Sequence, residues 1–217
     1  MTDKEKDFQF MMDSGVVAIL RAKDSSQLVT ACKALVEGGV RSIEVTMTTP
    51  NALAVINEVS TKMANDILIG VGTVLDPETA RAAILAGARF VVGPTLNLDV
   101  IKMCKRYTKI VVPGTFTPTE MLAAWEAGAD LCKLFPATAV GPEYIKDVLG
   151  PLPQIRIIPT GGVTAETAGA FIKAGAAAVA AGSAMVPSKA LAAGDTKTIA
   201  ETAAKFVKAV ADARAAK

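Results

Sequence analysis

The sequence predicts an α/β fold, a (β/α)8 barrel of the TIM type with an extra N-terminal helix, on three observations. Eight short apolar runs, rich in β-branched residues, alternate with amphipathic segments, as parallel strands covered on both faces do. The units recur about every 25 residues, close to one eighth of a typical barrel. No Gly-x-Gly-x-x-Gly follows the first run, which favours the barrel over a doubly wound open sheet. Glycines that can close a helix precede four of the strands: Gly38, Gly87, Gly128 and Gly175.

The strands are expected near residues 16–20, 42–46, 67–71, 89–92, 109–112, 130–135, 155–159 and 177–181. Residues 1–13 fit the extra helix, and residues 196–216 fit the helix that closes the chain. Thr49-Pro50 and Asp76-Pro77 each have a capping side chain followed by proline at the first helical position. Residues 117–120 add a capping box. Since there is no linker or low-complexity tract, residues 1–217 are predicted to be one barrel domain.

The composition is that of a globular protein, with 51% hydrophobic and 20% charged residues among 217. A net charge of +2 gives no electrostatic reason to expect nucleic acid or an anionic membrane as a partner. The N-terminus lacks an apolar signal-peptide core, and no run reaches the ~18 apolar residues of a membrane helix. Cys32, Cys104 and Cys132 are scattered without metal-ligand spacing, which indicates reduced thiols in a cytoplasm.

The chain contains no histidine. This excludes Ser-His and Cys-His nucleophile pairs, and it removes the imidazole ligands that catalytic zinc sites almost always use. A histidine-bound zinc site is therefore not expected; the expectation of no metal and no cofactor follows the family resemblance described below. If the protein is an enzyme, lysine, carboxylate, hydroxyl and backbone groups must do the chemistry.

A lysine in the middle of an apolar strand is the strongest chemical signal. In "ADLCKLFPA", Lys133 lies among apolar residues, where an unpaired ammonium is costly. Its side chain points either into the barrel or into the helix layer; the alternative is a lysine that snorkels outward. Enclosure would lower its pKa, and the neutral amine could form a Schiff base with a carbonyl. Glu44, near another strand end, is the candidate general acid/base, or else a structural ion-pair partner of Lys133 or Arg21.

Two glycine-containing loops follow the last two strands, where barrels commonly hold phosphate. Gly161 and Gly162 would let backbone N–H groups approach an anion, and Ser183 would contribute beside the next helix. The alternative is two ordinary turns. Arg21, at the end of the first strand, could neutralise a carboxylate or phosphate through a bidentate contact, or it could be a surface arginine.

Several motifs together resemble a known family. "GVVAILR", "GGVRSIEVTMTTP", "IGVGTV", "PGTFTPTE", "KLFPA", "PTGGV" and "GS" occur in the order seen in the 2-dehydro-3-deoxy-6-phosphogluconate (KDPG) / 4-hydroxy-2-oxoglutarate (KHG) aldolase family. The resemblance spans roughly residues 15–190. It implies a (β/α)8 barrel, usually a homotrimer, that uses no metal.

The resemblance also implies a role for each site residue. Lys133 would be the Schiff-base lysine and Glu44 the proton-transfer carboxylate. The remaining positions would bind the substrate: Arg21, Thr73 and Thr160 around the carboxylate and reacting carbons, Phe135 against the substrate, and Gly161, Gly162 and Ser183 on the phosphate.

The activity implied is that of a class I aldolase acting on a small 2-oxo acid. It would cleave KDPG to pyruvate and glyceraldehyde 3-phosphate, and KHG to pyruvate and glyoxylate. Well-known members carry an arginine where this chain has Thr48, which affects how the charged end of the substrate is anchored. Two other classes stay open: a phosphate-binding barrel isomerase or decarboxylase without a covalent adduct, and a non-catalytic, engineered or assembling barrel scaffold.

Overall fold

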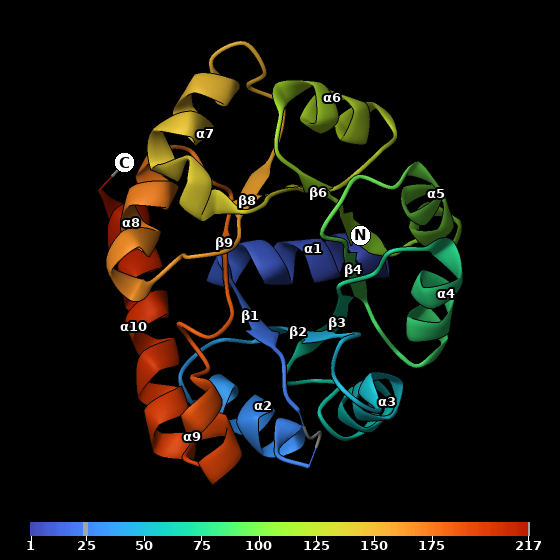
Figure 1. The fold of residues 1–217 in the computed structure, drawn as a ribbon, viewed down its shortest axis with the longest axis vertical. Helices are drawn as coiled ribbons and strands as arrows, with labels where there is room; N and C mark the ends of the chain where they lie inside the picture. Colours follow the sequence, from blue (N-terminus) through green and yellow to red (C-terminus); the bar gives the residue numbers. More distant parts are fainter. Residues whose placement is uncertain (24–25, 217) are drawn as a thin grey trace.

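Strands and helices alternate along the chain, and the helices surround the strands (Figure 1). The computed structural model describes residues 1–23 and 26–216. The strands are β1 Val16–Leu20, β2 Ser42–Thr46, β3 Leu68–Gly72, β4 Phe90–Val92, β5 Ile110–Val112, β6 Gly114–Thr115, β7 Cys132–Leu134, β8 Ile157–Pro159 and β9 Val179–Ala181. The helices are α1 Asp3–Ser14, α2 Leu28–Glu37, α3 Ala52–Lys62, α4 Pro77–Leu85, α5 Leu98–Arg106, α6 Pro118–Glu126, the 3₁₀ turn Ala137–Ala139, α7 Gly141–Leu149, α8 Ala165–Lys173, α9 Ser188–Ala193 and α10 Thr196–Ala215.

All the pairings between these strands are parallel, as the apolar runs predicted, but the strands form two sheets rather than one closed sheet of eight. The larger sheet has the order β5-β4-β3-β2-β1-β9, and the smaller has the order β6-β7-β8. The break lies at Pro113, which has no N–H to donate and follows the expected fifth strand of residues 109–112; beyond it, β6 belongs to the smaller sheet. At the other junction a single bridge joins Thr160 to Ala180.

Most helix boundaries follow the sequence signals, and two differ. Asp76 Oδ1 accepts a hydrogen bond from Thr79 N–H at 2.6 Å, and Thr117 forms the expected capping box. The prediction for Thr49 was wrong, because α3 begins after Asn51 and the Thr49 hydroxyl accepts from Ala22 N–H at 3.2 Å instead. The sequence predicted Gly38 as the glycine that closes α2, which is wrong by one position. The left-handed residue there is Gly39, with φ +86°, rather than Gly38.

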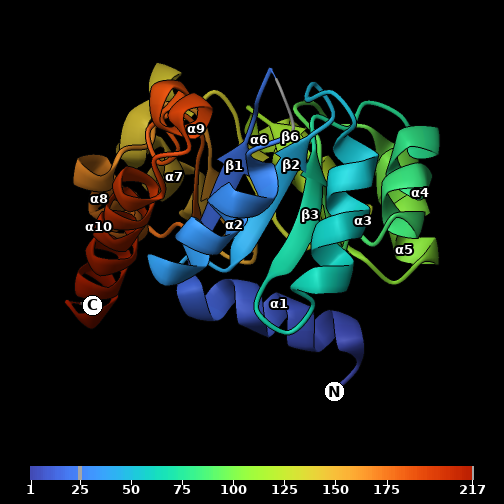
Figure 2. The same ribbon diagram turned by 90° about the horizontal axis from the view of Figure 1, so that it is seen from below.

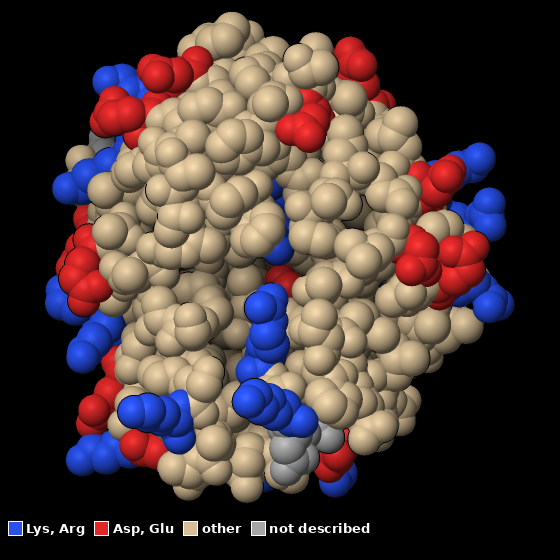
Figure 3. Space-filling model, in the orientation of Figure 1, with Lys and Arg blue, Asp and Glu red and all other residues tan. Residues whose placement is uncertain are grey.

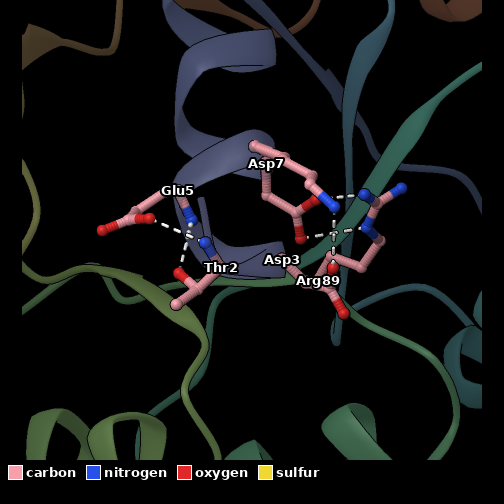
Figure 4. A network of polar contacts seen from close by, with 6 residues as sticks. Thr2, Asp3, Glu5, Asp7 and Arg89 are labelled. Atoms are coloured by element: carbon pink, nitrogen blue, oxygen red, sulfur yellow. Dashed lines mark hydrogen bonds and ion pairs between the residues drawn. The ribbon is translucent and has the colours of Figure 1, made fainter.

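Helix α1 closes the end of the strands at which they begin (Figure 2). Thr2 and Glu5 form a capping box at its start, and the buried Asp7 binds the Arg89 guanidinium through both carboxylate oxygens (Figure 4). Met11, on the same helix, is buried under the strands. A ligand must therefore enter at the opposite end, where the strands finish. Among the described helices, none is long and apolar enough to cross a membrane.

Candidate active site

Lys133 points into the space enclosed by the strands. It is the central residue of β7, with a side chain that is only 6% exposed. The interior cavity that it lines also includes Glu44, Phe90, Ile158 and Thr160. The neighbouring Cys132 and Leu134 belong instead to the core beneath the helices, as alternation along a strand requires. The outward, snorkelling alternative is therefore excluded.

The surroundings of Lys133 favour its neutral amine. Burial lowers the pKa of Lys133 below its usual 10.5, the Glu44 carboxylate acts in the opposite direction, and the Arg21 guanidinium lowers it further. The Lys133 nitrogen lies 5.0 Å from the centroid of the Phe135 ring, a contact that, like Glu44, favours the charged form. An amine that loses its proton more readily is a better nucleophile toward a carbonyl carbon.

Glu44 comes from β2 and is 2% exposed. Burial raises the pKa of its carboxyl, while the charges of Lys133 and Arg21 lower it. Within the described part of the chain, no ion pair shorter than 4.0 Å joins Glu44 to Lys133 or Arg21. Glu44 is therefore not held in place by an ion pair at contact distance. Its carboxyl is available for proton transfer.

Gly72 makes the room that the Glu44 carboxyl occupies. A Cβ at position 72 would lie 1.6 Å from Glu44 Oε1 and 2.6 Å from Glu44 Cγ. The next residue, Thr73, is half-buried with a left-handed φ of +59°, which is uncommon for threonine and typical of functional sites. Sequence reasoning found Thr73 but missed Gly72. The signal was available, since a glycine within an apolar strand often marks a close approach.

Thr160 and Phe135 complete the wall around the lysine. Thr160 follows β8, and its buried Oγ1 has no hydrogen-bond partner among the described residues. An orphaned buried hydroxyl is costly, so it is poised to bond to a bound ligand. Phe135, whose ring faces the Lys133 nitrogen, is 38% exposed.

The two glycines after β8 both have left-handed backbones, with φ +90° at Gly161 and +73° at Gly162. A Cβ on Gly161 would meet the Phe135 ring at 3.4 Å, so this loop lies beside Phe135. Ser183 is exposed in the turn after β9. That turn does not lead straight into a helix, because α9 begins only at Ser188.

Arg21 is exposed on the loop that follows β1. It lies close enough to act electrostatically on both Glu44 and Lys133. Figure 3, which looks onto the end where the strands finish, shows a hollow at the centre of this face with basic and acidic side chains in it. The structure therefore brings Glu44 of β2, Lys133 of β7 and Thr160 after β8 to one cavity, with the charge of Arg21 nearby.

Other reactive side chains do not compete with this lysine. Burial raises the pKa of the Cys132 thiol to about 12, so it is an inert core residue. Among the described residues there is no cluster of three or more histidine, cysteine, aspartate or glutamate residues that could hold a metal ion.

Comparison with known proteins identifies the family. The KDPG and KHG aldolase family model matches residues 9–202. The chain is 34% identical to 2-dehydro-3-deoxy-6-phosphogalactonate aldolase of Escherichia coli K12, over 91% of this chain and 95% of that protein. It is 33% identical to the KHG/KDPG aldolase of the same organism, over 88% and 90%.

A solved structure agrees with these matches. KDPG aldolase from Legionella pneumophila, with pyruvate captured as a covalent carbinolamine, superposes with a TM-score of 0.83 at 26% identity, over 94% of this chain and 98% of that one. The chain belongs to the KDPG and KHG aldolase family.

Proposed function

We propose that this protein is a class I aldolase that cleaves KDPG to pyruvate and glyceraldehyde 3-phosphate, and also KHG to pyruvate and glyoxylate. One observation carries the proposal: Lys133 and Glu44, from different strands, line the same cavity in the interior of the fold. Relatives over most of the chain are named for these substrates, and the carbinolamine in the Legionella structure is the kind of adduct that such a lysine forms.

The reaction begins at the amine of Lys133. Its nitrogen attacks the C2 ketone of the 2-oxo acid, and the carbinolamine loses water to give a protonated imine. The hydroxyl at C4 loses its proton, the C3–C4 bond breaks, and its electron pair moves into the imine to give an enamine. The aldehyde leaves, C3 of the enamine takes up a proton, and water hydrolyses the resulting imine. Pyruvate and the free lysine are the products, so no redox partner is required.

Glu44 moves the protons in this scheme. Burial raises the pKa of its carboxyl, so Glu44 holds a proton more readily than an exposed glutamate does, which suits a group that must both accept and donate one. It takes up the C4 hydroxyl proton and assists carbinolamine dehydration. Thr160 Oγ1, which has no partner within residues 1–23 and 26–216, donates to an oxygen of the bound intermediate.

The other positions bind the substrate in our proposal. Arg21 and Thr73 hold the carboxylate next to the reacting carbon, and Phe135 packs against the chain of the sugar acid. Gly161, Gly162 and Ser183 bind the terminal phosphate through backbone N–H groups and a hydroxyl. Support for a shared phosphate site comes from the bridge between Thr160 and Ala180, which places these two loops on neighbouring strands.

Reductive trapping tests the covalent step. Pyruvate with borohydride should fix a three-carbon adduct on the peptide that contains Lys133 and abolish pyruvate release from KDPG. Lys133→Arg should neither be labelled nor turn over, because a guanidinium stays charged and forms no imine. A label on another lysine, or cleavage without any label, would contradict the Schiff-base mechanism and favour a barrel enzyme that acts without covalent chemistry.

Glu44→Gln tests the proton-transfer role. The variant keeps the shape of the side chain but not its proton, so cleavage should slow by ~10²–10⁴-fold. Circular dichroism checks that it folds. A variant that unfolds, with normal activity in the fraction that stays folded, would favour a structural role.

We also propose that the two sheets act as one closed (β/α)8 barrel, folded as a single domain over residues 1–217. The hydrogen bond from Lys133 N–H to the Pro113 carbonyl, at 2.9 Å, supports closure across the interruption between β5 and β6. Membership of the family supports a role in sugar-acid breakdown through the Entner–Doudoroff pathway. The three free cysteines suit a cytoplasmic location.

A homotrimer is the assembly that we propose. Leu75 and Leu98, which are 56% and 54% exposed, lie near one another, because the Asn97 side-chain amide that caps α5 donates to the Leu75 carbonyl at 2.9 Å. Exposed leucines together suit a subunit interface. Light scattering should give three times the chain mass, and a monomeric mass would contradict the proposal.

A further inference from the structure

One side chain of the extra helix α1 reaches the cavity that holds the reactive lysine. Met11 is 1% exposed and lines that cavity together with Lys133, Glu44 and Phe90. It belongs to the core inside the strands, which also includes residues of β1, β3, β4 and β8. Because α1 covers the end at which the strands begin (Figure 2), Met11 forms part of the floor of the cavity.

The ring of Phe90 forms the other part of the floor. A Cβ at Gly70 would lie 2.5 Å from this ring, just as a Cβ at Gly72 would lie 1.6 Å from Glu44 Oε1. Gly70 and Gly72 share one face of β3, and Gly72 is nearer the end at which the strands finish. The ring of Phe90 therefore lies one layer beneath the Glu44 carboxyl. The floor under the reactive side chains is apolar.

Side chains fill this cavity almost completely. The remaining space is about 10 Å³, roughly what one water molecule needs. Removing the Met11 side chain beyond Cβ would enlarge a space that Lys133 and Glu44 also line, and a space with polar partners of this kind takes up water. Water there would solvate the ammonium of Lys133 and would reverse part of the desolvation that lowers the pKa of this group.

The charges that act on Lys133 come from two other elements. The Glu44 carboxylate, from β2, raises the pKa of Lys133, and the Arg21 guanidinium, from the loop after β1, lowers it. The remaining described residues that line the cavity, on α1, β1, β4, β5, β8 and β9 and at Thr160, are uncharged. Met11 therefore acts on the amine through exclusion of water and not through charge.

Contacts to the starts of four strands hold α1 in place. Each contact involves a charged residue that directly precedes its strand or lies two positions before it. Lys4 pairs with Asp130 at 2.8 Å, Asp7 pairs with Arg89 (Figure 4), the Arg156 guanidinium lies 5.3 Å from the centroid of the Phe8 ring, and that of Arg41 lies 5.4 Å from the centroid of the Phe10 ring. Since Met11 takes part in none of these contacts, a smaller side chain at position 11 should change the floor without releasing the helix.

We propose that Met11 is a positioning residue for the aldolase reaction: from α1 it seals the floor of the cavity and keeps water from reaching Lys133 from beneath. The proposal rests on the proposed aldolase function and deepens it. It gives the extra N-terminal helix a part in the reaction, because the helix supplies the surface that keeps the amine in dry surroundings.

The test measures how the rate of Lys133 labelling by pyruvate and borohydride depends on pH. In Met11→Ala, a hydrated amine keeps its proton to higher pH. The profile should therefore shift to higher pH, with a several-fold loss of rate near neutral pH and the wild-type rate at the alkaline plateau. Met11→Leu fills a similar volume with apolar atoms, so its profile should match that of wild type. If Met11→Ala does not fold, the smaller truncation Met11→Val takes its place.

Met121→Ala is the matched control. Met121 is equally buried, on α6, and its carbonyl accepts a hydrogen bond from Cys132 Sγ at 3.6 Å, so it lies on the helix side of β7 and not in the cavity. This variant should lose thermal stability, as Met11→Ala does, but its labelling profile should stay where it is in wild type.

Three results would overturn the proposal: an unshifted profile in folded Met11→Ala, the same shift in Met121→Ala, or a shift in Met11→Leu as large as that in Met11→Ala. Wild-type protein that is not labelled at any pH would instead refute the aldolase mechanism on which the proposal rests. Failure of the two proposals can therefore be told apart.

Discussion

Replacing Gly72 by alanine should displace the proton-transfer carboxyl while leaving the strand intact. Gly72 ends β3 and lies beside Thr46 of β2, and its φ lies outside the left-handed region, so an alanine backbone is not strained there. The added Cβ would lie 1.6 Å from Glu44 Oε1. To reach an ordinary contact of 3.4 Å, the carboxyl must retreat by about 1.8 Å, which is 3.4 minus 1.6 Å.

A displacement of this size should slow catalysis strongly but lower the free energy of unfolding only modestly. A misplacement of ~1 Å can cost ~10²-fold in rate, so kcat for KDPG cleavage should fall by at least about that factor. Overpacking a core typically costs ~1–3 kcal/mol, which a domain of this size should survive. Stopped-flow measurement of pyruvate release gives the rate, and thermal denaturation followed by circular dichroism gives the stability.

Repeating the substitution in a Glu44→Ala variant tests whether displacement of the Glu44 carboxyl is the cause of the rate loss. In Glu44→Ala the space beside position 72 is empty, so adding Gly72→Ala should cost almost nothing further, which is strong non-additivity between neighbours. Gly169→Ala on α8 is the matched glycine control, since its Cβ would come no nearer than 3.4 Å to Ala209 O. Full activity in Gly72→Ala, or the same rate loss in both backgrounds, would refute this account of the site.

Three further perturbations probe charge, loop and stability. Arg21→Gln removes a cation that lowers the pKa of Lys133, so that pKa should rise toward 10.5. The pH profile of single-turnover labelling by pyruvate should then shift to higher pH; an unchanged profile would show that Arg21 does not act on the amine. Gly162→Val places a side chain on a backbone with φ +73° in the proposed phosphate loop. Steady-state kinetics should therefore show a larger loss of activity toward KDPG than toward KHG. Equal losses for the two substrates would argue against a phosphate site there. Asp7→Asn removes the charge that binds Arg89 beneath the strands. Denaturant titration should show a free energy of unfolding lower by about 1–3 kcal/mol, while borohydride labelling of Lys133 stays intact. An unchanged unfolding midpoint would mean that the ion pair contributes nothing to stability.

Local sequence signals were sufficient to predict the positions of most helices and strands. The strand positions follow from apolar runs, because a parallel strand covered on both faces has no polar side to alternate with. Asp76 and Thr117 cap helices as expected, since a capping side chain bonds only to amides within its own first turn. Thr49 failed as a cap because its hydroxyl found a partner on another loop, at Ala22, which no local pattern reveals.

The sequence by itself determined the chemistry that is available and the candidates for it. A chain without histidine must rely on groups such as Lys133 and Glu44, and a lysine in an apolar strand has few reasons to be there. Their interior orientation was left open, because alternation fixes which residues share a face but not which face is inside.

Only the tertiary structure decided how the site is built. Residues from different strands meet because the parallel strands finish at the same end, and Gly72 matters only because β3 lies beside β2. Distances across a sheet depend on strand order and register, which are set by packing of the whole chain and are not written in any one segment.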